Sequence, residues 1–362
     1  MLSQPNINDG TPQSAELHTL DVEQLAAWLT PRLEGFVGPA VLEKFAGGQS
    51  NPTYTLTTPS RTYVLRTRPG PAAKLLPSAH AVEREFRIMQ ALGGSEVPVP
   101  RMHLLCEDES VIGRAFYVME FVSGRVLWDP ALPGMTAVER RAIYADMNRV
   151  IASLHNVSVA EAGLGDYGRA GNYFQRQISR WSRQYMSSQT VPIPSMDKLI
   201  EWLPAHIPDS ARDESAATIV HGDYRIDNLI FHQSEPRVLA VLDWELSTIG
   251  HPLADFSYNC LSWHIDPGVF RGLGGLDLDA LGIPAQRDYV RHYCERTRRY
   301  DADALMRDWN FYLAYNLFRL AAIAQGIARR VEVGTAASRE AGAMGAAAPA
   351  LSDLAWSFAR RA

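Results

Sequence analysis

The order of hydrophobic and polar positions divides the chain into a strand-rich part followed by a helix-rich part. Short alternating runs, rich in β-branched and aromatic residues, predict antiparallel strands at residues 41–45, 53–58 and 62–67. A helical pattern follows at 81–92, and two more strand patterns lie at 102–106 and 115–121. Five strands with one inserted helix are typical of an α+β layer.

Helical spacing dominates from Thr136 onward. The periodic patterns predict helices at 140–154, 175–185, 310–328 and 351–361, and a pair of short strands around a loop interrupts them near residue 225. Asp21 is placed to cap an earlier helix, which Pro31 stops. We therefore expect a mobile polar leader at 1–18, a sheet-bearing lobe at 19–122 and a mainly helical lobe at 123–362.

The segment from His221 to Asn228, together with the apolar run that ends at Asp243, carries the strongest chemical pattern. Asp223 is placed to accept the proton of a substrate hydroxyl and to orient its oxygen for in-line attack. Asn228 and Asp243 offer oxygen donors to Mg²⁺, and Arg225 could neutralise charge on a transferring phosphoryl group. Each residue alone could be a turn residue or a helix cap. Their joint spacing predicts phosphoryl transfer from ATP to an alcohol.

A run of small residues between the first two predicted strands could bring backbone amides close to phosphate oxygens. These residues are Gly47, Gly48, Ser50 and Asn51. A Gly-Gly pair is also common in a plain hairpin turn, so the pattern leaves both interpretations open.

The third predicted strand carries Val64 and Arg66 on one face. Val64 could line an apolar adenine slot while Arg66 reaches phosphate oxygens. The alternative is a solvated edge strand. Glu85, on the helix that follows, supplies a carboxylate that would hold the Arg66 guanidinium in place.

Composition narrows the possible partners and compartment. The formal net charge of −5 and the isoelectric point near 6.1 give no basic footprint for nucleic acid. The three cysteines are too few and too widely spaced for a disulfide framework, so we expect buried thiols. No targeting segment or membrane span is evident, and the chain is expected to be cytoplasmic.

Between about residues 45 and 255 the chain resembles the aminoglycoside phosphotransferase and kinase-like family. The resemblance implies a bilobal protein-kinase-like fold, with Asp223 as the base and Mg²⁺ on Asn228 and Asp243. It also implies that ATP binds between the lobes, its adenine held by a hinge that includes Glu120 and Val122. The chain departs from the family where many members have a nucleotide lysine, because Arg66 changes the hydrogen-bonding geometry.

Three motifs give a narrower resemblance, to the phosphotransferase domain of acyl-CoA dehydrogenase family members 10 and 11. They lie at 48–54, 75–80 and 172–185. This similarity implies ATP-dependent phosphorylation of a 4-hydroxyacyl-CoA at its hydroxyl, and a functional link to an acyl-CoA dehydrogenase. The 362 residues leave no room for the dehydrogenase domain, so a later elimination step would belong to another protein.

The charge balance of the helical part helps to indicate which compound accepts the phosphoryl group. Residues 251–362 hold 12 acidic and 13 basic side chains, whereas a polycationic aminoglycoside would favour an acidic lobe. Arg176 and Arg180, four apart on one predicted helix, could meet the phosphates of a CoA ester or could form structural ion pairs. The remaining alternatives are a kinase for an aminoglycoside or another small alcohol, and a non-enzymatic nucleotide-binding protein.

Overall fold

The computed structural model describes residues 20–45, 51–70, 81–334 and 341–362. The chain forms two compact units. The first holds the residues up to 90 together with 100–121, and the second holds 91–99 and 122–362. Each unit is described by itself.

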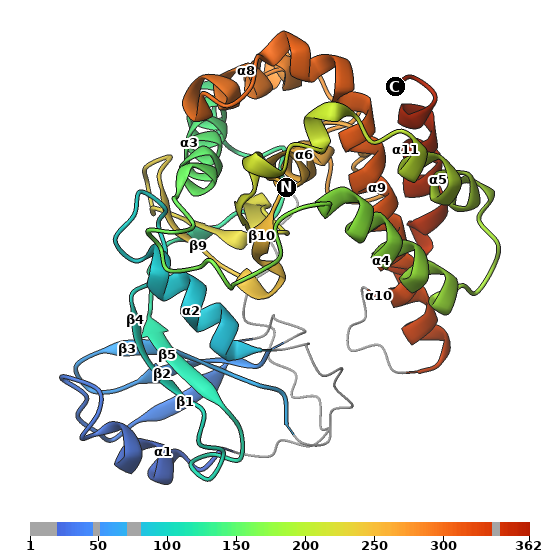
Figure 1. Cartoon of the computed structure of the whole chain (residues 1–362). Helices are drawn as coiled ribbons and strands as arrows, with labels where there is room; N and C mark the ends of the chain where they lie inside the picture. The colour runs from blue at the N-terminus through green and yellow to red at the C-terminus, as the bar shows by residue number, and fades with distance from the viewer. Residues whose placement is uncertain (1–19, 46–50, 71–80, 335–340) are drawn as a thin grey trace. The chain divides into compact units, whose positions relative to one another are not determined.

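The first unit contains a five-stranded antiparallel sheet in the order β1-β2-β3-β5-β4 (Figure 1). The strands are β1 (Val41–Lys44), β2 (Thr53–Thr57), β3 (Thr62–Thr67), β4 (Met102–Cys106) and β5 (Phe116–Glu120). Helix α2 (Val82–Leu92) follows β3. All five predicted strands and the inserted helix are confirmed, because alternation of apolar and polar residues specifies a half-buried sheet.

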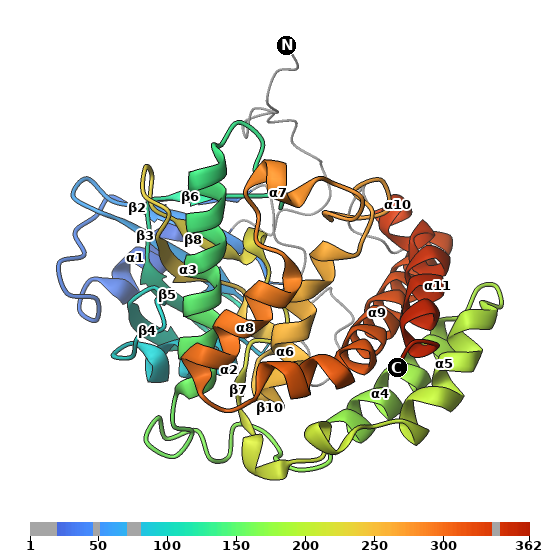
Figure 2. The same ribbon diagram turned by 90° about the horizontal axis from the view of Figure 1, so that it is seen from above.

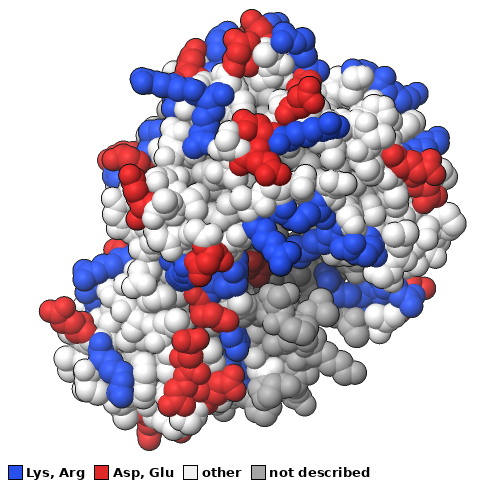
Figure 3. All heavy atoms as spheres, in the orientation of Figure 1, with Lys and Arg blue, Asp and Glu red and all other residues white. Residues whose placement is uncertain are grey.

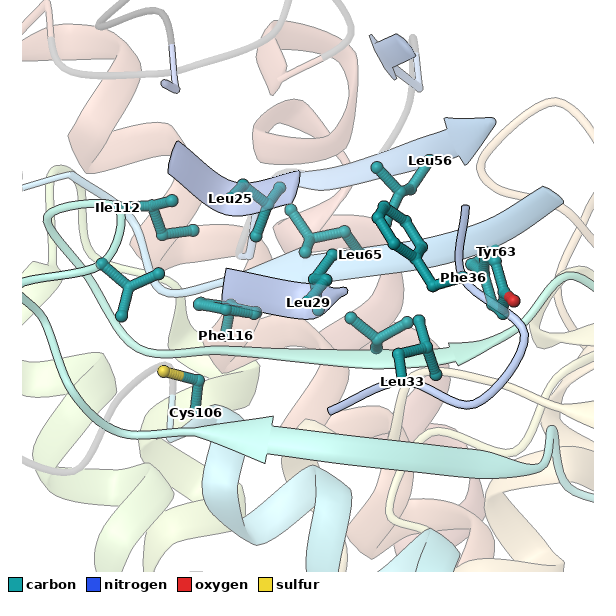
Figure 4. Packing of buried hydrophobic residues seen from close by; sticks show 12 residues of the cluster. Leu25, Leu29, Leu33, Phe36, Leu56, Tyr63, Leu65, Cys106, Ile112 and Phe116 are labelled. Carbon is teal, nitrogen blue, oxygen red and sulfur yellow. The ribbon is translucent and has the colours of Figure 1, made fainter. Parts of the chain in front are cut away.

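Helix α1 (Val22–Leu29) covers one face of this sheet. Asp21 caps it by accepting a hydrogen bond from the Gln24 backbone N–H at 2.9 Å, as the sequence predicted. Figure 4 shows the apolar cluster in which Leu25 and Leu29 meet Leu65 of β3. Side chains alternate along a strand, so the residues between these cluster members face the other side of the sheet.

The second unit is mainly helical. Its helices are α3 (Ala137–Asn156), α4 (Tyr173–Ser188), α5 (Pro194–Ala205), α6 (Pro252–Asn259), α7 (Leu278–Leu281), α8 (Gln286–Thr297), α9 (Ala302–Glu332), α10 (Ala341–Ala346) and α11 (Ala348–Ala359). In Figures 1 and 2 the long α9 lies beside α4 and α11, which agrees with their residue contacts. Residues 311–318 of α9 are buried all round, as expected for a helix at the centre of a bundle.

Two small sheets are inserted between these helices. β7 (Thr218–Val220) pairs with β10 (Thr248–Gly250), while β8 (Leu229–Phe231) lies between β6 (Arg125–Val126) and β9 (Val238–Val241). The two short strands predicted around the loop are confirmed. β7 and β8 flank the loop, but each is hydrogen-bonded into a different sheet, which anchors the loop at both ends.

The predicted α+β fold class, with an antiparallel sheet first and a mainly helical part after it, is confirmed. The three cysteines are buried free thiols, as expected. Among the residues that the structure describes, none of the helices combines the length and the apolar composition needed to cross a membrane.

Candidate active site

Asp223 lies in the loop between β7 and β8, and both oxygens of its carboxylate have partners. Oδ1 accepts a hydrogen bond from the Tyr258 hydroxyl at 2.8 Å, and the Arg225 Nε lies 3.1 Å from the same oxygen. Oδ2 accepts a hydrogen bond from Asn228 Nδ2 at 3.1 Å. A carboxylate oxygen has two lone pairs, so this fixed side chain keeps capacity to accept the proton of a substrate hydroxyl.

Asn228 and Asp243 are joined through the backbone. The Leu242 N–H donates to the Asn228 carbonyl at 2.8 Å, which places the residue before Asp243 against the catalytic loop. Asn228 also donates its Nδ2 to the Asp223 carbonyl at 2.8 Å, so its amide oxygen is the atom left for a cation. Asp243 adopts a left-handed backbone conformation, with φ of 63°.

The donor chemistry of these two residues fits Mg²⁺, which takes one or two protein oxygens plus phosphate oxygens and water. The described residues contain no cluster of three or more His, Cys, Asp or Glu side chains that could enclose a metal. A cation at this loop would therefore depend on phosphate for the rest of its ligands.

Arg225 is held between two carboxylates. Its Nη2 lies 3.3 Å from Asp227 Oδ2, in addition to the contact with Asp223. Burial opposes its charge, but Asp223, Tyr258 and Asp227 outweigh burial and hold the pKa of Arg225 above its usual value. The guanidinium is thus a fixed positive charge beside the proposed base.

Asp255, at 2% exposure, braces the first residues of the loop. Its carboxylate accepts the backbone N–H of His221 at 2.6 Å and that of Gly222 at 2.8 Å, which is a structural role. His155 Nε2 lies 3.2 Å from the same carboxylate, and His155 Nδ1 lies 2.7 Å from the Tyr293 hydroxyl. Burial lowers the pKa of His155, so the neutral ring donates from Nε2 to the carboxylate.

Electrostatics at Asp255 favours the ionised form. Burial alone would raise its pKa, but the hydrogen bonds from His155 and from the His221 backbone outweigh burial, so the pKa lies below the usual range. His221 itself accepts the Asp223 N–H at Nδ1 and donates from Nε2 to the Leu242 carbonyl at 2.8 Å. This histidine therefore connects the loop to the Asp243 segment and does not act as a metal ligand.

Tyr258 and Arg319 contact the catalytic loop but were not anticipated from the sequence. Arg319, 6% exposed on α9, donates Nη2 to the Gly222 carbonyl, and its guanidinium lies 4.9 Å from the Tyr258 ring and 5.5 Å from the Trp181 ring. Burial opposes its charge, but Tyr315, Tyr258 and other neighbours raise the pKa of Arg319 overall. An arginine inside an otherwise apolar helix was the available signal for Arg319, whereas no pattern marked Tyr258.

In the first unit, Arg66 and Glu85 form the predicted pair. The Arg66 Nε lies 2.9 Å from Glu85 Oε2, and the glutamate is almost fully buried. Glu85 also accepts hydrogen bonds from Asn51 Nδ2 at 2.5 Å and from the Tyr117 hydroxyl at 3.2 Å. Arg66, Glu85 and Asn51 are thus brought together, while Gly47, Gly48 and Ser50 lie outside the described residues.

The other nucleotide candidates occupy β3 and the end of β5. Val64 is buried on β3 opposite Met119 of β5, on the side of the sheet away from the α1 cluster. Glu120 donates its N–H to the Arg101 carbonyl at 2.9 Å. The backbone group of Glu120 that could still bind a nucleotide is therefore its carbonyl. Val122 lies two residues after the end of β5. The nucleotide-binding roles of these residues stay predictions.

Arg176 and Arg180 lie on α4. Arg176 donates to the Arg169 carbonyl at 2.6 Å, and Arg180 lies 5.3 Å from the Trp181 ring. Within the described part of the chain, neither arginine makes an ion pair with a carboxylate. The alternative of structural ion pairs therefore finds no support among these residues.

Comparisons with known proteins agree with this geometry. The family model described as "Phosphotransferase enzyme family" matches residues 41–302. Mouse acyl-CoA dehydrogenase family member 10 is 45% identical over 90% of this chain, which spans only 30% of the mouse protein. The chain spans less than half the length of the other curated relatives that it matches, including the rat family member 11 at 41% identity.

Two solved structures are informative about the fold. A crystal structure from Ralstonia eutropha JMP134, assigned only provisionally as an aminoglycoside phosphotransferase, is 56% identical, with a TM-score of 0.85 and coverage of 94% of this chain and 99% of that one. A thermostable mutant of aminoglycoside phosphotransferase APH(4)-Ia, in complex with ADP and hygromycin B, gives a TM-score of 0.56 at 14% identity. That match covers 93% of this chain and 98% of the other, and it supports the fold alone.

Proposed function

Because the chain belongs to the phosphotransferase enzyme family, we propose that it transfers the γ-phosphoryl group of ATP to the hydroxyl of a 4-hydroxyacyl-CoA. The observation that supports this acceptor is the surface of α4 beside the catalytic loop, which carries arginines and no acidic side chain. The carrying observation for the reaction is the Asp223, Asn228 and Asp243 set, held together by hydrogen bonds through the loop.

The residues of the loop divide the chemistry among them. Asp223 accepts the proton of the acceptor hydroxyl as its oxygen attacks, and its partners keep the carboxylate in one orientation. Arg225 stabilises negative charge near the attacking oxygen. Asn228 and Asp243 would hold Mg²⁺, which when bound neutralises charge on the nucleotide phosphates.

The nucleotide part of the proposal rests on the first unit. The Arg66 guanidinium, fixed by the buried Glu85 carboxylate, is suited to pair with phosphate oxygens, because a guanidinium can bind them through two N–H groups. Asn51 and Tyr117 satisfy the remaining hydrogen-bonding capacity of Glu85. This network holds the carboxylate in one orientation.

The acceptor part rests on α4. The helix carries Arg176, Arg180 and Arg183 and no Asp or Glu. In Figure 3, basic side chains gather in the region where Figure 1 draws α4. Trp181 of the same helix contacts Arg319, which holds the Gly222 carbonyl, so α4 lies close to the base. A CoA ester supplies phosphates for such a surface, whereas the ammonium groups of an aminoglycoside would be repelled.

The test is phosphoryl transfer by the purified protein with Mg-ATP and 4-hydroxyvaleryl-CoA or its homologues. Asp223→Asn serves as the negative control, and Arg180→Glu should raise the KM for the CoA ester more than it lowers kcat. The proposal fails if no chain length is phosphorylated. The similarity to acyl-CoA dehydrogenase family members also supports a link to a dehydrogenase that would act on the product.

A kinase for an aminoglycoside or another small alcohol is the second candidate. The provisional description of the Ralstonia structure favours it. Kanamycin and hygromycin B belong in the same assay as competing acceptors. Phosphorylation of either antibiotic, without phosphorylation of a CoA ester, would replace the leading proposal.

A further inference from the structure

A pocket in the second unit begins beside the catalytic base and is used by none of the steps above. Arg225 and Tyr258, the two side chains that contact Asp223 Oδ1, both line it. Its floor is apolar and buried, formed by Tyr144, Met147, Leu261 and Ile265. An acceptor whose hydroxyl lies at Asp223 would therefore be separated from this pocket by a single side chain.

The rim of the pocket is aromatic and charged. Trp128 is 54% exposed, and the Arg271 guanidinium lies 4.9 Å from its ring. Arg271 also pairs with Asp227 at 2.6 Å, and Asp227 in turn pairs with Arg225. Arg225 also contacts Asp223, so two arginines alternate with two carboxylates at this end of the pocket and their charges balance.

The size of the pocket limits what it can hold. Its volume is about 50 Å³, roughly a third of an engineered cavity of about 150 Å³ that admits benzene. A sugar ring does not fit such a space, but a short alkyl segment of a few carbons does. An apolar floor under a polar rim also favours an alkyl group over a hydroxylated one.

We propose that this pocket binds the alkyl tail of the acceptor, on the far side of the reacting hydroxyl from the CoA group, and so sets chain-length preference. The inference rests on the proposed acyl-CoA acceptor and adds a second binding site to it. The CoA phosphates would lie on the arginines of α4, while the tail would lie against Met147 and Ile265. The hydroxyl would sit at Asp223 between these two anchors.

The experiment measures kcat/KM for 4-hydroxyacyl-CoA esters that differ by one methylene. The wild-type value should rise about fourfold for each of the first few methylenes beyond the hydroxyl carbon, because that is the gain from burying one CH₂ group. It should then level off when the pocket is full. A flat profile across the short esters would overturn the proposal.

Two variants and a matched control separate the pocket from general effects. Ser262→Phe places a ring into the pocket and should lower the ratio of long-ester to short-ester kcat/KM at least tenfold. Trp128→Ala, at a half-exposed position, should raise the KM for the longer esters several-fold. Val138→Phe, 75% exposed on α3 and outside the pocket, should leave the ratio at the wild-type value. An unchanged ratio in Ser262→Phe contradicts the proposal.

A binding measurement distinguishes failure of the pocket from failure of the proposed reaction. The affinities of butanoyl-CoA and hexanoyl-CoA, which lack the hydroxyl, are measured by calorimetry on the wild type and on Ser262→Phe. Selective weakening of hexanoyl-CoA supports the pocket even where phosphoryl transfer fails. Equal weakening of both esters, together with active phosphorylation, overturns the pocket alone.

Discussion

Replacing Asp255 by Asn tests whether the brace beneath the catalytic loop is electrostatic. The wild-type carboxylate accepts two backbone N–H groups, at 2.6 and 2.8 Å, and faces His155 Nε2 at 3.2 Å. An amide of the same shape has one accepting oxygen, and its NH₂ group would face at least one of these donors. One or two of the three interactions are therefore lost, depending on which way the amide is turned.

The size of the effect follows from these contacts. A hydrogen bond to a charged group contributes about 1.5–3 kcal/mol, and leaving a buried donor unsatisfied costs about 1–3 kcal/mol more. We expect Asp255→Asn to lower the free energy of unfolding by about 3–5 kcal/mol, a large share of the stability of a typical domain. Urea unfolding at pH 7 measures this difference.

A matched control uses the same chemical change on the surface. Asp279 is exposed, and Asp279→Asn should change the free energy of unfolding by less than about 0.5 kcal/mol. If Asp255→Asn stays within about 1 kcal/mol of the wild type, the carboxylate does not brace the loop and the reasoning is refuted.

The remaining predictions concern pH, the base, the nucleotide and the metal. The pKa of Asp255 is depressed in the folded protein, so its stabilisation is complete above the unfolded pKa of about 3.9 and is lost as the pH falls through the folded pKa. The difference in free energy of unfolding between wild type and Asp255→Asn should therefore shrink between about pH 5 and pH 3, as measured by urea titrations. Asp223→Asn should lower kcat by about 10²–10⁴ with little change in nucleotide affinity, and a near wild-type kcat would contradict its role as base. Arg66→Lys should raise the KM for ATP less than Arg66→Leu does, since lysine keeps the charge but loses the bidentate hydrogen bonding. Equal KM values in the wild type and both variants would argue against a contact between Arg66 and phosphate. Asp243→Asn should raise the Mg²⁺ concentration needed for half-maximal activity at least tenfold, and an unchanged Mg²⁺ dependence would remove it from the metal site.

The sequence was sufficient for the strands of the first unit and for the reaction type. Alternation in the first 121 residues specified all five strands, because the side-chain period of a half-buried strand is visible in a single chain. The spacing of Asp223 and Asn228 indicated phosphoryl transfer, since both residues lie within one short loop and need no long-range contact to be brought together. The partner of Arg66 was also predictable, from the charge on the helix after its strand.

Tertiary structure decided what surrounds the base. Tyr258 and Arg319 lie 35 and 96 residues along the chain from Asp223, and only the packing of α6 and α9 brings them to the loop. The pairing of β7 with β10, and of β6 with β8, likewise depends on long-range contacts that alternation cannot encode. Local pattern therefore predicted which residues react, whereas packing determined how they are held, because a buried polar contact requires partners that the chain supplies from distant segments.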